Sequence, residues 1–220
     1  MKDNSAMNNN CLEIDTIKVE STNSKKYVSL MSYIPNDERE VQFKRELCDA
    51  ISIGVNEFHV PICDPSINEQ GGISFVPGNK PALGYSFTEL QDIAKKNDIR
   101  LGTKEEYYLF VGTIILSLIS QGWSEKDAWH AVCSDSRGLG HYSDSENAKR
   151  DYEVTGSRKV AGKCDLANTF KILAKTRYGN SFLIASGNCN ASGFISSIAT
   201  TVLSCNFENP LTNAVGWFVF

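Results

Sequence analysis

Apolar residues recur at helical spacing before residue 134. Residues 36–53 predict a helix that ends at Gly54. Its predicted inward face consists of Val41, Phe43, Leu47, Cys48 and Ile51. Residues 107–119 form the most apolar run of the chain, but this run is too short for a membrane span. We therefore expect a buried central helix at residues 104–121 and no membrane insertion.

Three short polar patterns predict where further helices begin. Ser86-Phe-Thr-Glu89 and Thr103-Lys-Glu-Glu106 are capping boxes, in which the hydroxyl and the carboxylate satisfy unpaired backbone amides reciprocally. Ser124 begins a third predicted helix. The residues of that helix expected to face inward are Ala128, Trp129, Val132 and Cys133.

Strand signals come before and after these helices. Residues 27–34 and residues 57–62 are apolar and rich in strand formers. After residue 134, brief apolar pieces separated by Gly, Ser, Asn and Asp predict short strands at 159–161, 169–174, 181–185 and 215–220. The terminal piece is too apolar for an exposed edge, so we expect residues 215–220 to pair with residues 57–62. These elements predict an α+β fold with a small twisted antiparallel sheet and two to four helices.

Composition narrows the classes of function. The formal net charge of −4 and the lack of a Lys/Arg-rich stripe predict no nucleic-acid partner. Residues 1–10 are polar and Asn-rich, which predicts no signal peptide and a cytoplasmic location. The seven cysteines are odd in number and include no C-x-x-C pair, so we expect reduced thiols rather than a zinc site or a disulfide framework. No disulfide pairing and no oligomeric state is predicted.

One string carries a resemblance to a known fold. Arg100-Leu-Gly-Thr-Lys-Glu-Glu-Tyr107 resembles the R-L-P-T-x-x-E-W/Y signature of C-type-lectin-like proteins, with Gly102 where proline is usual. That group includes formylglycine-generating enzymes and the variable proteins of diversity-generating retroelements. A weaker likeness lies in Ala185-Ser-Gly-Asn188 and Ala214-Val-Gly-Trp217, which are similar to the turn and the final strand of such domains. The resemblance implies a C-type-lectin-like domain at 57–220 after an N-terminal lead-in, 1–56, that contains a strand and a helix.

The resemblance also suggests chemistries that the residues can be checked against. Calcium-dependent lectins need E-P-N or Q-P-D with W-N-D, and neither triplet occurs, so we expect no metal and no cofactor. A formylglycine-generating or thiol-dependent enzyme would need a reactive cysteine among Cys133, Cys189 and Cys205. His130 lies three residues from Cys133, but seven cysteines and three histidines produce such pairs by chance. We therefore predict no catalytic residues, and keep this kind of enzyme as the alternative.

The best functional candidate is residues 186–213, which mix small polar residues with isolated large apolar ones. Such a mixture is typical of recognition surfaces, in which small polar groups adapt and large groups anchor. The predicted ligand-binding residues are Asn188, Asn190, Ser192, Phe194, Ser196, Asn206, Phe207 and Asn209. In the retroelement proteins this region carries the diversified side chains. The resemblance therefore implies a bacterial or phage recognition module for a protein or cell-surface ligand. A phage virion decoration protein, associated with the particle, is the other alternative.

Overall fold

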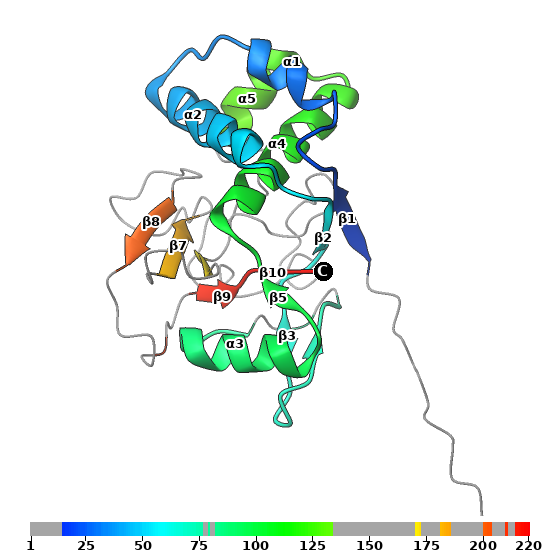
Figure 1. The fold of residues 1–220 in the computed structure, drawn as a ribbon, viewed down its shortest axis with the longest axis vertical. Coiled ribbons are helices and arrows are strands. Elements are labelled where there is room, and N and C mark those ends of the chain that lie inside the picture. Colours follow the sequence, from blue (N-terminus) through cyan, green and yellow to red (C-terminus); the bar gives the residue numbers. More distant parts are fainter. Residues whose placement is uncertain are drawn as a thin grey trace, which may run out of the picture.

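The structure is a computed structural model, and it combines helices with small sheets, which confirms the α+β class. The predicted number of two to four helices is wrong, because the described residues contain five. It describes residues 15–76, 79, 82–133, 170–172, 181–185, 200–203, 210 and 214–220. The helices are α1 (Tyr27–Ser32), α2 (Glu38–Ile53), α3 (Phe87–Lys96), α4 (Lys104–Ser120) and α5 (Glu125–Cys133). The strands are β1 (Thr16–Val19), β2 (Phe58–Pro61), β3 (Ser66–Ile67), β4 (Ile73–Ser74), β5 (Arg100–Leu101), β6 (Phe170–Ile172), β7 (Ser181–Ala185), β8 (Thr200–Leu203), β9 (Ala214–Gly216) and β10 (Phe218–Val219). In Figure 1, α1, α2, α4 and α5 gather at one end, α3 lies at the other with β3 beside it, and the other labelled strands lie between them.

The helix α2 ends where the sequence predicts, before Gly54, but begins at Glu38, two residues later than predicted. The Asp37 carboxylate accepts hydrogen bonds from the backbone N–H groups of Arg39 and Glu40, at 2.9 and 3.0 Å. Gly54 follows the helix with φ = 83°, a conformation that favours glycine. The predicted inward face is only partly correct, because Val41 and Cys48 are exposed. The residues buried instead are Glu40, Phe43, Leu47 and Ala50.

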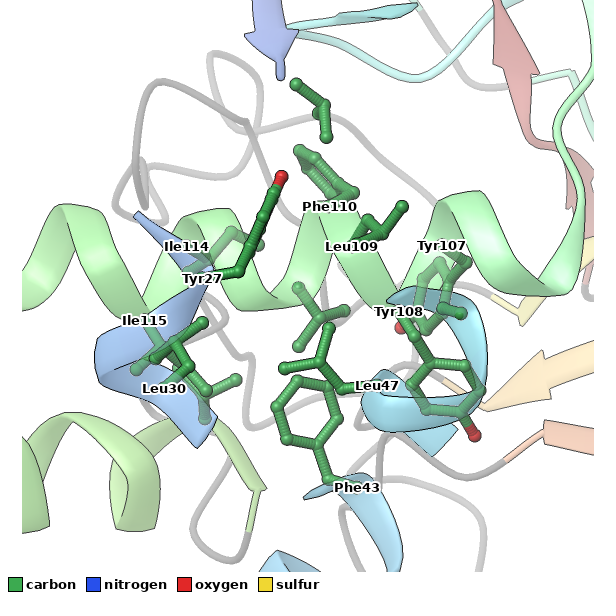
Figure 2. Packing of buried hydrophobic residues seen from close by; sticks show 14 of the residues in the cluster. Tyr27, Leu30, Phe43, Leu47, Tyr107, Tyr108, Leu109, Phe110, Ile114 and Ile115 are labelled. Carbon is green, nitrogen blue, oxygen red and sulfur yellow. The ribbon is translucent and has the colours of Figure 1, made fainter. Parts of the chain in front are cut away.

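The strand predicted at residues 27–34 is wrong, since this segment contains the helix α1. Tyr27 and Leu30 lie three residues apart on one helical face, and both are buried. Figure 2 shows both side chains packed toward α4. Strand propensity describes how well a side chain fits a half-buried sheet, so packing against a central helix overrides it.

The three later helices match their predicted start signals. Ser86 and Thr103 accept hydrogen bonds from the N–H groups of Glu89 and Glu106, and the two glutamates accept from the cap residues in return. The Asp127 N–H donates to the Ser124 hydroxyl at 3.1 Å. All the inward residues predicted for α5 are buried.

The central helix α4 forms the middle of the main hydrophobic core. Its side chains are buried around most of its circumference, as an internal helix requires. Phe43 and Leu47 of α2 pack on it from one direction, and Tyr27 and Leu30 of α1 from another (Figure 2). One continuous core thus joins residues before and after position 56. No helix in the described part of the chain has the length and apolar composition needed to cross a bilayer.

Short strands bring the chain terminus into the centre of the molecule. β1 pairs with β2 in antiparallel fashion, and β10 pairs with β5. His59 of β2 and Phe220 exchange two backbone hydrogen bonds, at 3.0 and 3.2 Å. The predicted meeting of residues 57–62 with residues 215–220 is therefore confirmed at this one residue pair. β1, which the sequence analysis left inside the lead-in, is the longer partner of β2.

A second sheet contains four strands in the order β8-β7-β6-β9. β6 and β7 confirm the strands predicted at residues 169–174 and 181–185. β6 also pairs with β9, in parallel. β8 was not predicted, and it lies within the segment chosen as the candidate surface.

Candidate functional site

The four-stranded sheet brackets the candidate surface at residues 186–213. β7 ends at Ala185 and β9 begins at Ala214, and both strands pair with β6. β8, in the middle of the segment, pairs with β7. The strands on either side of residues 186–199 and of residues 204–213 therefore belong to the same sheet. Figure 1 labels three of its strands, β7, β8 and β9.

The strands that follow this segment are fixed in the core. Val215, Trp217, Phe218 and Val219 are at most 2% exposed. The Trp217 indole packs against Tyr107 and Phe110 of α4, and against Phe58 of β2. The chain thus leaves the candidate surface directly into a rigid anchor.

The string that resembles the lectin-like signature connects α4 to this anchor. Arg100 donates two hydrogen bonds to the Glu106 carboxylate, at 2.7 and 2.5 Å, and Glu106 is only 5% exposed. The Thr103 N–H donates to the same carboxylate at 2.8 Å. β5, at the start of the string, pairs with β10. The matching residues of the string therefore hold the start of α4 beside the final strand.

The predicted binding residues themselves lie outside the described residues. They are Asn188, Asn190, Ser192, Phe194, Ser196, Asn206, Phe207 and Asn209. The structure thus describes the frame of the candidate surface, which is β7, β8, β9 and β10. Of the segment between β7 and β9, it describes β8 and the exposed Pro210.

A second cluster of polar side chains lies where α2 meets α5. The His130 Nδ1 atom lies 3.9 Å from Asp37 Oδ2 and 3.9 Å from Glu40 Oε1. One ligand atom from each of the three residues falls within 4.8 Å of the other two. Asp37 and His130 reach solvent, whereas Glu40 is completely buried. We call these residues the α2–α5 cluster.

Glu40 is held by contacts to one of its two carboxylate oxygens. Oε2 accepts hydrogen bonds from the Tyr33 hydroxyl at 3.0 Å and from the Asn36 N–H at 2.7 Å. Burial, together with this hydrogen bond to a carboxylate, raises the pKa of Tyr33 well above its usual range. Tyr33 also stacks on Trp129, with ring centroids 4.5 Å apart. Oε1 has no hydrogen-bond partner within the described part of the chain.

Cys133 lies close to this cluster but is a poor candidate nucleophile. Its thiol is fully buried at the end of α5. Burial raises the pKa of Cys133, and the negative charges of Glu40 and Asp37 raise it further. A catalytic cysteine needs a stabilised thiolate, and this environment favours the neutral thiol. The geometry thus argues against Cys133 as the base-activated thiol of an enzyme.

Of the three residues in the α2–α5 cluster, only His130 was a candidate from the sequence. His130 was considered only as a partner of Cys133. Asp37 and Glu40 carry the pattern of an acidic first helical turn, which is common and indicates a helix start. What distinguishes Glu40 from an ordinary acidic residue at a helix start is that it is buried on the same face of α2 as Phe43 and Leu47. That burial is known only from the packed structure.

Neither a protein-family model, nor a curated protein, nor a solved structure matches this chain.

Proposed function

We propose that the chain is a ligand-recognition module with a C-type-lectin-like fold, and that residues 186–213 carry its binding surface. The observation that supports this proposal most directly is the anchoring at both ends of the segment. A recognition loop gains affinity when its ends are rigid, because less conformational entropy is lost on binding. β7 and β9 supply such ends on a shared sheet.

The contacts of the signature-like string support the lectin-like part of the proposal. Arg100, Thr103 and Glu106 are the polar residues that the string shares with the family, and each contacts another of the three. Gly102, the departure from the family, contacts Trp217 of the chain terminus. The string and the final strand therefore form one unit.

The proposed ligand is a protein or a cell-surface molecule, held without a metal or cofactor at this surface. Asn, Ser and Gly in the segment supply adaptable hydrogen-bonding groups, and Phe194 and Phe207 supply apolar anchors. Diversified side chains on a fixed frame would change the choice of ligand without changing the fold.

A stability measurement separates a binding surface from a core segment. One variant carries alanine in place of six of the predicted binding residues, Asn188, Asn190, Phe194, Ser196, Asn206 and Phe207. Its free energy of unfolding should lie within about 1 kcal/mol of the wild-type value. The matched control is Phe218→Ala. This residue is buried just beyond the segment, and the substitution should cost about 3–5 kcal/mol. If the combined variant lost as much free energy of unfolding as the control, the segment would belong to the core and the proposal would be refuted.

The gene tests the diversification directly. Sequencing the coding region from many related isolates should show substitutions concentrated in codons 186–213 and nearly constant codons for β7, β9 and β10. A nearby reverse-transcriptase gene, with an adenine-rich near-copy of the 3′ coding end, should accompany them. Substitutions spread evenly along the gene, with no such near-copy, would contradict a retroelement-diversified surface.

A further inference from the structure

The α2–α5 cluster joins ligand-type atoms from two helices that are far apart in sequence. Asp37 is the cap of α2, Glu40 lies in its first turn, and His130 lies in α5. The two helices contact each other, so the packing of the helical end fixes the spacing of the three side chains. This site is remote in sequence from residues 186–213, and its role does not depend on the proposed function.

Glu40 is the unusual member of the cluster. A carboxylate that is removed from water is unfavourable unless its oxygens are paired. Oε2 is paired twice, but Oε1 is buried, has no hydrogen-bond partner among the described residues, and lies 3.9 Å from His130 Nδ1. A carboxylate oxygen that has lost its contact with water is stabilised by a cation or by a hydrogen-bond donor, and this position beside His130 could hold either one.

We propose that Asp37, Glu40 and His130 bind one divalent first-row transition-metal ion, with Zn²⁺ as the preferred ion. Carboxylate and imidazole groups are the ligands that Zn²⁺ takes at sites with three protein ligands and one open position. The imidazole favours Zn²⁺ over Mg²⁺ and Ca²⁺, which prefer oxygen ligands alone.

Two of the three separations between ligand atoms require only a small adjustment, and the third, between the two carboxylates, is at most 4.8 Å. Ligand atoms at about 2.1 Å from a tetrahedral ion lie about 3.4 Å from one another. The two measured separations from His130 Nδ1 are 3.9 Å, so each must shorten by about half an ångström. The His130 side chain is 57% exposed, so its ring has room to move toward the two carboxylates.

The charges also favour a cation. The start of α2 carries a partial positive charge of about half a unit, which repels an ion. Two carboxylates oppose it with up to two negative charges, and a neutral imidazole adds a lone pair. The carboxylates therefore dominate the local field. The helix cap fixes the backbone that positions both carboxylates.

A protonated His130 is the competing explanation, because an imidazolium could donate to Glu40 Oε1 with no ion present. The two explanations differ in one respect. The metal site predicts that added Zn²⁺ stabilises the protein at neutral pH, and a simple ion pair predicts no response to Zn²⁺.

The test is a titration of the full chain with ZnCl₂, by calorimetry and by thermal unfolding. The wild type should bind one Zn²⁺ ion and should melt at a higher temperature with it. His130→Ala removes an exposed ligand and should weaken Zn²⁺ binding by about tenfold or more. Asp37→Asn keeps a residue that can cap the helix, and it should also weaken Zn²⁺ binding because the carboxylate is removed.

Matched controls exclude other binding groups. Glu38→Gln changes an exposed carboxylate in the same helical turn, and His59→Ala changes a histidine of β2. Cys48→Ser removes an exposed thiol that could capture Zn²⁺. These variants should bind Zn²⁺ as the wild type does. Equal affinity of His130→Ala and the wild type, or no Zn²⁺-dependent stabilisation of the wild type, would overturn the proposal.

Discussion

At the scale of single residues, the contacts of Gly102 explain why glycine stands where the lectin-like signature has proline. Its N–H donates to the Trp217 carbonyl at 2.8 Å, and proline has no N–H to donate. A Cβ atom at this position would lie 2.1 and 2.3 Å from two Trp217 ring carbons. The side chain of Trp217 thus occupies the space that a larger residue would need.

We predict that Gly102→Ala destabilises the protein by about 3 kcal/mol, because the indole must leave its well-packed position. Gly54→Ala is the control. A methyl group at position 54 meets no atom within 4 Å, so this substitution costs only the strain of a positive φ, about 1 kcal/mol. Urea unfolding measures both differences.

A double substitution shows whether the clash is the cause. In a Trp217→Leu background the clashing ring carbons are absent, so Gly102→Ala should cost clearly less than in the wild type. An unchanged cost in that background would mean that the indole is not what excludes the methyl group.

At the scale of elements, the capping boxes decide where α3 and α4 begin. In α3 the Glu89 carboxylate accepts a hydrogen bond from the Ser86 N–H at 2.7 Å. This backbone hydrogen bond, helped by the Ser86 hydroxyl, lowers the pKa of Glu89 below its ordinary value of 4.5. The folded state therefore prefers the charged form of Glu89.

We predict that the stabilising effect of Glu89 depends on pH. Because its pKa is lower in the folded state, its contribution is complete above pH 4.5 and is lost as the pH falls through the folded pKa. Glu89→Gln should thus cost about 0.5–1 kcal/mol at pH 7 and much less near pH 3.

Unfolding by urea at several pH values tests this expectation. Asp92→Asn, in the exposed middle of the same helix, serves as the control and should show a smaller change with pH. A Glu89→Gln penalty that is the same at pH 3 and pH 7 would argue that the carboxylate charge does not stabilise the helix start.

At the scale of the whole molecule, the last four residues contact three different regions of the fold. Trp217 packs against α4, Phe218 belongs to the smaller core beside α3, and Phe220 bonds to β2. β10 meets β5 between the helical end and α3 (Figure 1). The chain terminus is therefore a structural centre of the fold.

We predict that a chain ending at Gly216 shows no cooperative thermal unfolding. It would lose the buried side chains of Trp217, Phe218 and Val219 and the backbone pairs with β5 and His59. Loss of a single large buried aromatic residue already costs about 3–5 kcal/mol, which is a large part of a typical domain's stability.

Circular dichroism during heating measures this prediction. Phe220→Ala is the control, because the Phe220 side chain is 40% exposed and its backbone bonds to His59 are kept. It should still unfold cooperatively. A truncated chain with a sharp transition near that of the full chain would show that the terminal residues are dispensable.

The helix starts and stops were readable from the sequence, and so was the apolar central helix. Ser86, Thr103 and Ser124 cap helices as predicted, because a cap is satisfied by atoms only three residues away. The strands β6 and β7 were also predicted, since short apolar pieces between turn residues are a local signal.

Packing over long distances in the sequence decided the rest. Residues 27–32 became helical because α4 offered a surface for Tyr27 and Leu30. Asp37 and Glu40 meet His130 across some ninety positions of the sequence, and nothing local to either helix encodes that contact. Local order is set by each residue's immediate neighbours, whereas burial and the composition of a site depend on which distant surfaces come together. The sequence therefore determined most of the helices by itself, and only the tertiary structure decided which of their side chains share a site.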